Sequence, residues 1–186
     1  MQIIIQPGQA EQTINKSRFV AIAEYCADER AVAIALRRLA SAHQSAHHLA
    51  YAFRLQTPQG VVQRFSDAGE PSGTAGKPVL QFLEGRNLIN TCVGVIRYYG
   101  GINLGTGGLV RAYGGTAKMA LDAASFGEYV EMQKIRVDLD YKKLDGFIRD
   151  VDRLNGEVLD KAFGEYVTVI ASVPAHEVPS LQQKYG

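Results

Sequence analysis

The chain has 186 residues, of which 46% are apolar and 21% charged, and its formal net charge is +1. This composition excludes a disordered chain, because it supplies enough apolar side chains for one large core or two small ones. Residues 1–130 carry 12 Lys and Arg against 9 Asp and Glu, and the remainder carries 8 against 10. The positive excess in residues 1–130 is too small to establish a nucleic-acid partner.

Cysteine usage and hydropathy bear on the compartment. Cys26 and Cys92 are isolated, with no CxxC pair, no secretory leader precedes them, and no apolar run is long enough to span a membrane. We therefore expect a cytoplasmic protein with reduced cysteines and no membrane partner.

The first 130 residues show alternating strand and helix patterns. Residues 13–26 are predicted as one strand, and Asp28 caps an amphipathic helix over 29–40. A hairpin around the turn TPQG follows, and after an irregular loop a short helix begins at Pro78 and is ended by Gly85. Residues 88–99 are apolar on both faces and predict a central strand, which leads to a helix from about Thr106 to Ala124.

A fresh pattern begins after the predicted junction FGEYVEMQK, so we expect domains at 1–130 and 131–186. Residues 135–141, 157–163 and 166–173 are predicted as strands, 144–154 as a helix, and a further helix starts at AHEVPSLQQ. The order βαββα predicts a ferredoxin-like module whose last strand is missing. We expect a truncated tail, an unusual edge or a partner that covers the open edge.

Thirteen of the 19 glycines lie between Gly60 and Gly115. The segment SGTAGKP fails as a Walker A motif because Pro71 and Pro78 occupy two required positions. GTGGLV fails as a dinucleotide fingerprint because Val110 stands where a third glycine is required. Two interpretations stay open for the glycines: close packing of a helix on a sheet, or a backbone anion site at a helix start.

Several polar residues suggest sites of other kinds. Asp67 and Glu70 either chelate Mg²⁺ or pair with Arg64 or Lys77. His43 and His47 have the spacing of a zinc pair, but no third ligand is indicated, so packed or solvated histidines are favoured. A hydrolytic triad is not supported, since the chain has no nucleophile elbow. No catalytic residue, metal ligand or cofactor is assigned.

Three segments taken together, KSRFVA, SDAGEPSGTAGKPVL and VIRYYGGINLGTGGLVRAYGG, resemble the YigZ/Impact family. The resemblance is strong over about residues 10–125 and implies an α+β protein. The resemblance implies that the N-terminal domain is an α/β sandwich similar to the ribosomal-protein domain-2-like fold and to GHMP kinases. It also implies that the C-terminal domain is similar to the ferredoxin-like last domain of elongation factor G.

The family's signature positions suggest a common surface. The candidate nucleic-acid or anion contacts, which include two neighbouring hydroxyl residues, are Lys16, Ser17, Arg18, Ser72, Gly73, Thr74, Gly76, Lys77, Arg97, Gly100, Gly101, Gly105, Thr106, Gly107, Gly108 and Arg111. Asp67 and Glu70 are the candidate cation-binding or structural carboxylates.

The resemblance implies a translation-linked or RNA-linked role, since eukaryotic relatives restrain a starvation-response kinase by binding its coactivator. We expect a non-enzymatic regulator that binds RNA or a ribosome-associated protein through a glycine-rich, basic face, without DNA specificity. One alternative is a nucleotide- or phosphate-binding enzyme that uses Gly105–Gly108 with Asp67 and Glu70. A second is a protein-interaction module. The oligomeric state is left open.

Overall fold

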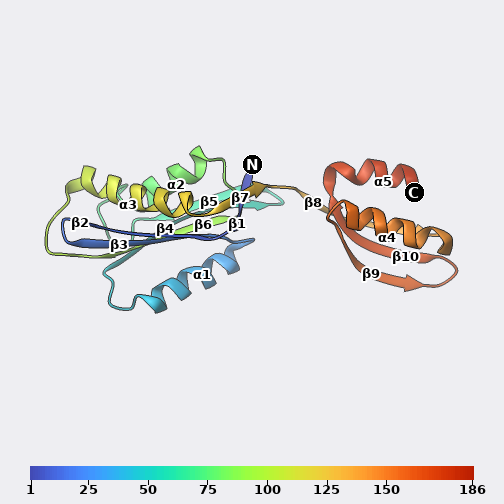
Figure 1. Cartoon of the computed structure of the whole chain (residues 1–186), viewed down its shortest axis with the longest axis horizontal. Coiled ribbons are helices and arrows are strands. Elements are labelled where there is room, and N and C mark those ends of the chain that lie inside the picture. Colours follow the sequence, from blue (N-terminus) through green and yellow to red (C-terminus); the bar gives the residue numbers. More distant parts are fainter. The chain divides into compact units, whose positions relative to one another are not determined.

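The computed structural model describes all 186 residues, which form two compact units, Met1–Tyr129 and Val130–Gly186. Five α-helices and three antiparallel sheets make the chain an α+β protein (Figure 1). No helix is long and apolar enough to cross a membrane.

A five-stranded antiparallel sheet with the strand order β2-β3-β6-β4-β5 forms the centre of the first unit. Its strands are β2 (Gly8–Ile14), β3 (Ser17–Tyr25), β4 (His48–Thr57), β5 (Gly60–Ser66) and β6 (Thr91–Tyr98). Residues 91–97 are all buried, so the prediction of a central strand is confirmed.

Three helices cover the two faces of this sheet. The helix α1 (Glu29–Ala42) lies on one face, and α2 (Gly76–Gly85) and α3 (Gly105–Asp122) lie on the other (Figure 1). The largest apolar cluster fills the space under α2 and α3, and it includes the fully buried Tyr113. Because α3 begins shortly after β6 ends, the glycine-rich connection lies at one end of the sheet.

The single strand predicted over residues 13–26 is wrong, because this segment forms a hairpin of β2 and β3. The two-residue turn is Asn15-Lys16, and both residues have positive φ, 46° and 65°. Such a turn suits the twist of a hairpin and usually contains glycine. The absence of glycine explains why the sequence pattern gave no turn signal.

A small two-stranded sheet in the first unit was also missed. It pairs β1 (Gln2–Gln6) with β7 (Ser125–Glu128). Residues 126–134 were predicted as a junction, but the first part of that range is strand. Strands this short leave little local pattern in the sequence, and each depends on a partner strand about 120 residues away.

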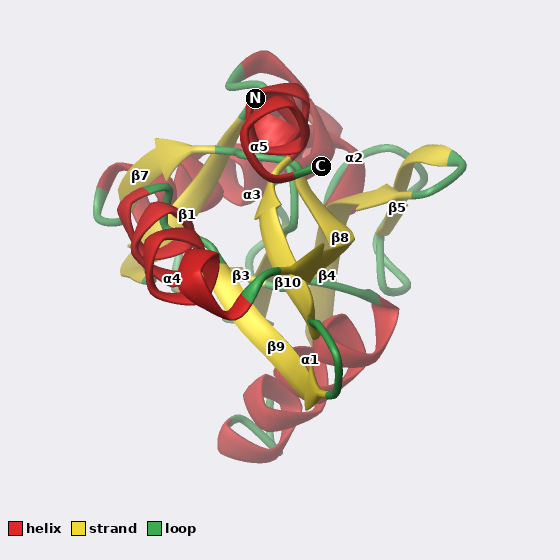
Figure 2. Cartoon of the chain, turned by 90° about the vertical axis from the view of Figure 1, so that its right-hand side faces the viewer, coloured by secondary structure: helices red, strands yellow, loops and turns green.

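The second unit has a three-stranded antiparallel sheet with the order β8-β10-β9 (Figure 2). Its elements are β8 (Met132–Leu139), α4 (Leu144–Arg153), β9 (Glu157–Phe163), β10 (Val167–Pro174) and α5 (Val178–Tyr185), with 3₁₀ turns at Tyr141–Lys143 and Ala175–Glu177. Alternate residues of β8 and β10 pack against apolar side chains of both helices. The other sheet face carries Lys134, Arg136 and Asp138 of β8 and Thr168, Ile170 and Ser172 of β10.

Candidate functional site

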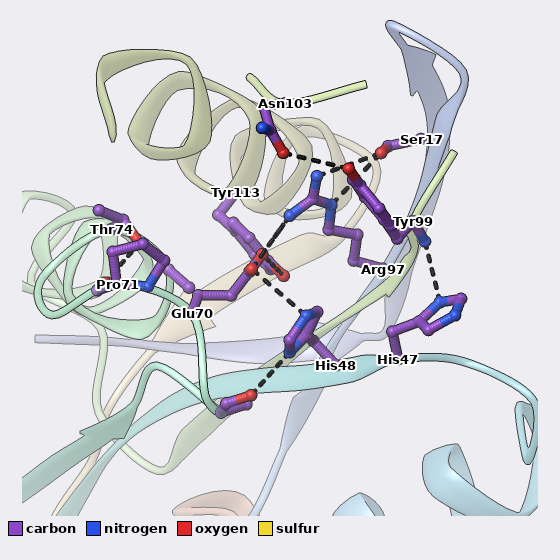
Figure 3. A network of polar contacts seen from close by, with 12 residues as sticks. Ser17, His47, His48, Glu70, Pro71, Thr74, Arg97, Tyr99, Asn103 and Tyr113 are labelled. Carbon is purple, nitrogen blue, oxygen red and sulfur yellow. Dashed lines mark hydrogen bonds and ion pairs between the residues drawn. The ribbon is translucent and has the colours of Figure 1, made fainter. Parts of the chain in front are cut away.

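Arg97, near the end of β6, is the centre of a buried polar network (Figure 3). Its side chain is 5% exposed. Nη1 donates to both carboxylate oxygens of Glu70, at 3.0 and 2.7 Å, and Nε and Nη2 both lie 3.3 Å from Oγ of Ser17. A guanidinium this deep needs a counter-charge, because an unpaired buried charge is costly. The network therefore joins one residue from each of the three family segments.

Glu70 has two further partners. The hydroxyl of Tyr113 on α3 donates to Oε2 of Glu70 at 2.6 Å, and Nε2 of His48 lies 3.3 Å from Oε1. Nδ1 of His48 lies 2.8 Å from the carbonyl oxygen of Ala68, to which it must donate. Burial, together with the adjacent Glu70 carboxylate, raises the pKa of Tyr113 far above its usual value, so this phenol stays protonated and donates.

Two aromatic rings border the guanidinium of Arg97. Its central carbon lies 5.7 Å from the centre of the Phe19 ring and 5.1 Å from that of Tyr99. Tyr99 is 42% exposed, and its hydroxyl donates to Oδ1 of Asn103 at 3.1 Å. The arginine is thus held in place by cation–π contacts as well as hydrogen bonds, while one of the two rings faces solvent.

The glycine-rich connection packs closely on the β2–β3 turn. The amide of Gly100 donates to Oγ of Ser17 at 3.2 Å. A Cβ at Gly100 would lie only 2.1 Å from the carbonyl oxygen of Lys16, so no larger residue fits without movement of the backbone. Close packing therefore explains this glycine, and it brings Lys16 beside the β6–α3 loop.

Asp67 binds the N-terminus of α2 from within the chain. Its carboxylate accepts from the amides of Gly73 at 2.8 Å, Ala75 at 3.1 Å and Gly76 at 2.9 Å, with the Lys77 amide at 3.5 Å. Burial would raise the pKa of Asp67, but these backbone donors outweigh it and the pKa is lowered. The helix begins two residues before the predicted Pro78 because this carboxylate satisfies its first amides.

These contacts revise the predictions for the SDAGEPSGTAGKP loop. Its amides do bind an anion, but that anion is the chain's own Asp67. The expected pairing of Asp67 or Glu70 with Arg64 or Lys77 is wrong: Arg64 pairs with Glu29 at 3.1 Å, and Lys77 makes no ion pair. The Thr74 hydroxyl is likewise used internally, since it donates to the carbonyl of Pro71 at 2.6 Å.

A cavity of about 530 Å³ opens beside this network. Arg97, Glu70, His48 and Tyr99 form one side, and the start of α3 with Leu109 forms the other. The lining combines buried charged groups with apolar and aromatic surface, as small-molecule and nucleotide sites do.

The N-terminus of α3 differs from that of α2. Leu104 occupies its N-cap position, and no side chain accepts from the first amides of the helix. Gly105 has φ of 74°, a left-handed conformation that favours glycine. Gly105 and Thr106 line the cavity, so the backbone donors and partial positive charge of this helix end are available to a ligand there.

A second cavity, of about 400 Å³, adjoins the first, and Leu104 lines both cavities. Arg111, Gly108 and Asn15 contribute to its lining. Arg111 is exposed and has no ion-pair partner. The exposed cations of two family segments, Lys16 and Arg111, therefore border the same end of the first unit.

The structure brings some of the predicted residues together and separates others. Those at the two cavities or in the buried network are Ser17, Glu70, Arg97, Gly100, Gly105, Thr106, Gly108 and Arg111, with Lys16 adjoining. Those that line neither cavity are Arg18, which pairs with Glu11, and Asp67, Ser72, Gly73, Thr74, Gly76, Lys77, Gly101 and Gly107.

Sequence reasoning missed four residues of the site, namely His48, Tyr99, Asn103 and Tyr113. The last three lie within the family segments, but nothing in their spacing marked them. His43 and His47 do not form a zinc pair: His43 contacts the Tyr98 hydroxyl and Nδ1 of His47 accepts from the Tyr99 amide. No group of three or more His, Cys, Asp or Glu side chains is placed to hold a metal ion.

Comparison with known proteins shows the family to which the chain belongs. A model of the Impact N-terminal domain matches residues 15–121. The chain is 32% identical to IMPACT family member YigZ of Escherichia coli strain K12 over 179 residues, which cover 96% of this chain and 88% of that protein.

Two solved structures are similar to the chain to different degrees. The crystal structure of a hypothetical protein shares 31% identity with a TM-score of 0.76 over 98% of this chain and 89% of its own. The two-domain translational regulator Yih1 is a weaker match, with 23% identity and a TM-score of 0.43 over 64% of this chain and 48% of that one. The domain model covers more than half of the chain and the bacterial relative almost all of it, and we conclude that the chain belongs to the IMPACT family.

Proposed function

We propose that the chain is a non-enzymatic, translation-linked regulator that binds RNA through the face around the start of α3. The observation that carries the proposal is the α3 N-terminus, which has no capping side chain and opens on a cavity beside Arg97. The link to translation comes from the family resemblance described above.

The contrast between two helix N-termini supports a phosphate contact at α3. The first amides of α2 donate to the carboxylate of Asp67, whereas no side chain accepts a hydrogen bond from the first amides of α3. Helix N-termini bind phosphate groups through such amides and through the helix dipole. Lys16 and Arg111 add exposed, unpaired cations beside this end, which suits contacts to successive phosphates.

Tyr99 supports recognition of bases. Its ring borders the same cavity and is 42% exposed, while Arg97 packs on it and Oδ1 of Asn103 accepts a hydrogen bond from its hydroxyl. Proteins that bind unpaired RNA commonly stack bases on aromatic side chains. A single-stranded segment is therefore the form of RNA that the face fits best.

A titration with a fluorescent single-stranded RNA tests the proposal. Lys16→Ala and Arg111→Ala are expected to weaken binding several-fold each and to reduce the slope of log affinity against log salt by about 0.7, since each removes one phosphate contact. Arg37→Ala is the matched control, because this exposed arginine lies on α1 across the sheet. Arg97 is unsuitable for this test, since its loss would leave Glu70 unpaired.

The outcomes separate RNA from a protein partner. No binding of RNA, or binding that neither variant alters, would refute the RNA proposal. Sedimentation of the chain with ribosomes that persists after nuclease treatment would indicate a ribosome-associated protein instead.

A second candidate is a small phosphate-containing ligand, such as a nucleotide, in the cavity of about 530 Å³. Gly105 and Thr106 would hold its phosphate. Asp67 does not line this cavity, and both it and Glu70 already bind protein donors, so we expect no dependence on Mg²⁺. A ligand present at about 100 times its dissociation constant adds about 2.7 kcal/mol of stability, so a thermal-shift panel of nucleotides would detect it.

The finer fold kinships are part of the same proposal. The order β8-β10-β9 with both helices on one face supports a ferredoxin-like second domain that includes about residues 131–186. The five-stranded sheet with helices on both faces supports a first domain at 1–130 similar to the ribosomal-protein domain-2-like fold.

A further inference from the structure

The chain has two cysteines, and both lie on the face of the central sheet that α1 covers. Cys26 is 1% and Cys92 is 2% exposed, and both belong to one apolar cluster with Val32 of α1. We propose that this pair is a reversible oxidation site, at which hydrogen peroxide converts the two thiols into a disulfide. The proposal does not depend on RNA binding, because α3 lies on the opposite face of the sheet.

The strand pairing places the two cysteines diagonally across β3 and β6. Cys92 lies opposite Glu24. Cys26 follows the last residue of β3, and its amide donates to the carbonyl oxygen of Asn90 at 2.9 Å. Residues two apart along a strand share a face, so Cys26 lies on the same face as Glu24 and Cys92. The two side chains are in contact, since the thiol of Cys92 donates a hydrogen bond to the sulfur of Cys26.

The two thiols differ in access to solvent. Cys92 lies inside the central strand β6, where residues 91–97 are all buried. Cys26 lies at the end of β3 and directly precedes Ala27 and Asp28, which are exposed and lead into α1. The ends of strands and helices open more often than the centre of a sheet. A small oxidant therefore reaches Cys26 before it reaches Cys92.

The acidity of the two thiols supports the same order. The hydrogen bond from Cys92 lowers the pKa of Cys26, because it stabilises the thiolate. The same hydrogen bond and burial raise the pKa of Cys92, which stays protonated. Because the thiolate is the nucleophile, Cys26 attacks the peroxide and Cys92 completes the disulfide.

The reaction takes two steps. The sulfur of Cys26 attacks one oxygen of hydrogen peroxide, the O–O bond breaks, and Cys26 becomes a sulfenic acid while the leaving hydroxide takes up the thiol proton as water. The sulfur of Cys92 then attacks the sulfur of Cys26, the S–O bond breaks, and the hydroxyl leaves with the proton of Cys92 as a second water. The two thiols together lose two electrons and two protons, and one peroxide is reduced to two waters.

The diagonal placement favours a disulfide that is easily reduced. Diagonal positions of antiparallel strands have Cα atoms about 7–8 Å apart, whereas disulfides span about 4.4–6.8 Å between Cα atoms. Closure of the bond therefore draws Cys26 toward β6, which its position beyond the end of β3 permits. A disulfide under strain is reduced readily by thiols, so the oxidation is expected to be reversible.

Mass spectrometry of the 186-residue chain tests the proposal. After brief exposure to hydrogen peroxide, the chain is denatured and treated with N-ethylmaleimide, which labels both cysteines of the reduced chain. The oxidised chain is expected to be a monomer that takes no label and is two hydrogen atoms lighter than the reduced chain. Peptide mapping is expected to find Cys26 linked to Cys92, and dithiothreitol should restore both thiols.

Single variants test the order of attack. Cys92→Ala removes the second thiol, so the sulfenic acid of Cys26 is expected to accumulate and to react with dimedone. Cys26→Ala leaves a buried, protonated Cys92, which is expected to react at least about tenfold more slowly. Alanine suits both positions, because a buried free cysteine behaves as a small apolar side chain. Circular dichroism checks that each variant folds.

Variants at the start of α1 test the route of access. Oδ1 of Asp28 accepts from the Ala31 amide at 2.8 Å and so caps this helix. Asp28→Ala removes the cap and is expected to speed disulfide formation several-fold, because the start of α1 opens more often. Asp28→Ser is the matched control, since it removes the same charge but keeps a capping hydroxyl. It is expected to react more slowly than D28A.

Three results would overturn the proposal. The first is a chain that keeps both thiols at a peroxide concentration that oxidises free cysteine. The second is oxidation that links two chains, or that carries Cys26 past the sulfenic acid without a bond to Cys92. The third is a Cys92 that reacts as fast in C26A as Cys26 does in C92A. Equal rates for D28A and D28S would overturn the entry of peroxide at the start of α1.

Discussion

Replacement of Arg97 by methionine is the sharpest test of the buried network. Methionine keeps much of the length of the side chain but removes its charge and donors. The Glu70 side chain, 6% exposed, would lose two hydrogen bonds and its counter-charge, and keep only Tyr113 and His48 as polar neighbours. Removal of one partner of a buried ion pair costs about 3–5 kcal/mol. We expect this loss for the first unit.

The loss of stability should depend on whether the opposite charge of the Arg97–Glu70 pair is still present. Glu70→Met alone leaves Arg97 with only Ser17 and the two rings, and it should cost a similar amount. The double variant R97M/E70M leaves no unpaired charge and removes mainly an acceptor for Tyr113, which costs about 1–2 kcal/mol. It should therefore be more stable than either single variant.

Hydrogen exchange of the β6 amides is the appropriate assay, because the chain has two units and one unfolding curve would mix them. Amides of this buried central strand exchange through unfolding of the first unit. A loss of 3–5 kcal/mol accelerates their exchange by roughly two to four orders of magnitude. A loss below about 1 kcal/mol for R97M, or a double variant whose loss equals the sum of the single losses, would refute the assignment of a coupled buried pair.

Two further predictions concern the loops around this network. Asp67→Asn should destabilise the first unit by about 1–2 kcal/mol at neutral pH. Because the pKa of Asp67 is lowered in the folded chain, this difference in stability between the two chains is present above the unfolded pKa and should vanish as the pH falls through the folded pKa. A stability difference that persists in acid would contradict the role assigned to Asp67. Gly100→Ala should cost more than about 2 kcal/mol, because its Cβ would lie 2.1 Å from the carbonyl oxygen of Lys16. Gly85→Ala, where no atom lies within 4 Å, should be neutral or slightly stabilising in the same exchange assay, and equal losses for the two variants would argue against close packing at Gly100.

Local sequence signals predicted the elements that local chemistry determines. The helix α1 was placed by its apolar periodicity and by Asp28, whose Oδ1 accepts from the Ala31 amide at 2.8 Å. The hairpin of β4 and β5 and the central strand β6 follow from period-two patterns and an unbroken apolar run. These features depend on residues a few positions apart, so one sequence suffices to find them.

The features that depend on distant residues were not predictable in the same way. Glu70 and Arg97 are separated by 27 positions, and Glu70 and Tyr113 by 43. No spacing rule connects them, so Glu70 was assigned to a cation or to a nearby lysine or arginine. The role of Asp67 was missed for a related reason, because a carboxylate nine residues before a helix is not a recognised cap.

The structure also changes what the family signature implies about function. Ser17, Glu70 and Arg97 satisfy one another, and Asp67 satisfies the amides of the loop that follows it, so the fold alone accounts for these positions. Lys16 and Arg111 have no such account, because these two cations make no ion pair, and they lie near the start of α3, which has no side-chain cap. Variants of the first group will reduce binding by destabilising the unit, whatever the ligand. Only variants of the second group, with stability unchanged, can show what the open helix end binds.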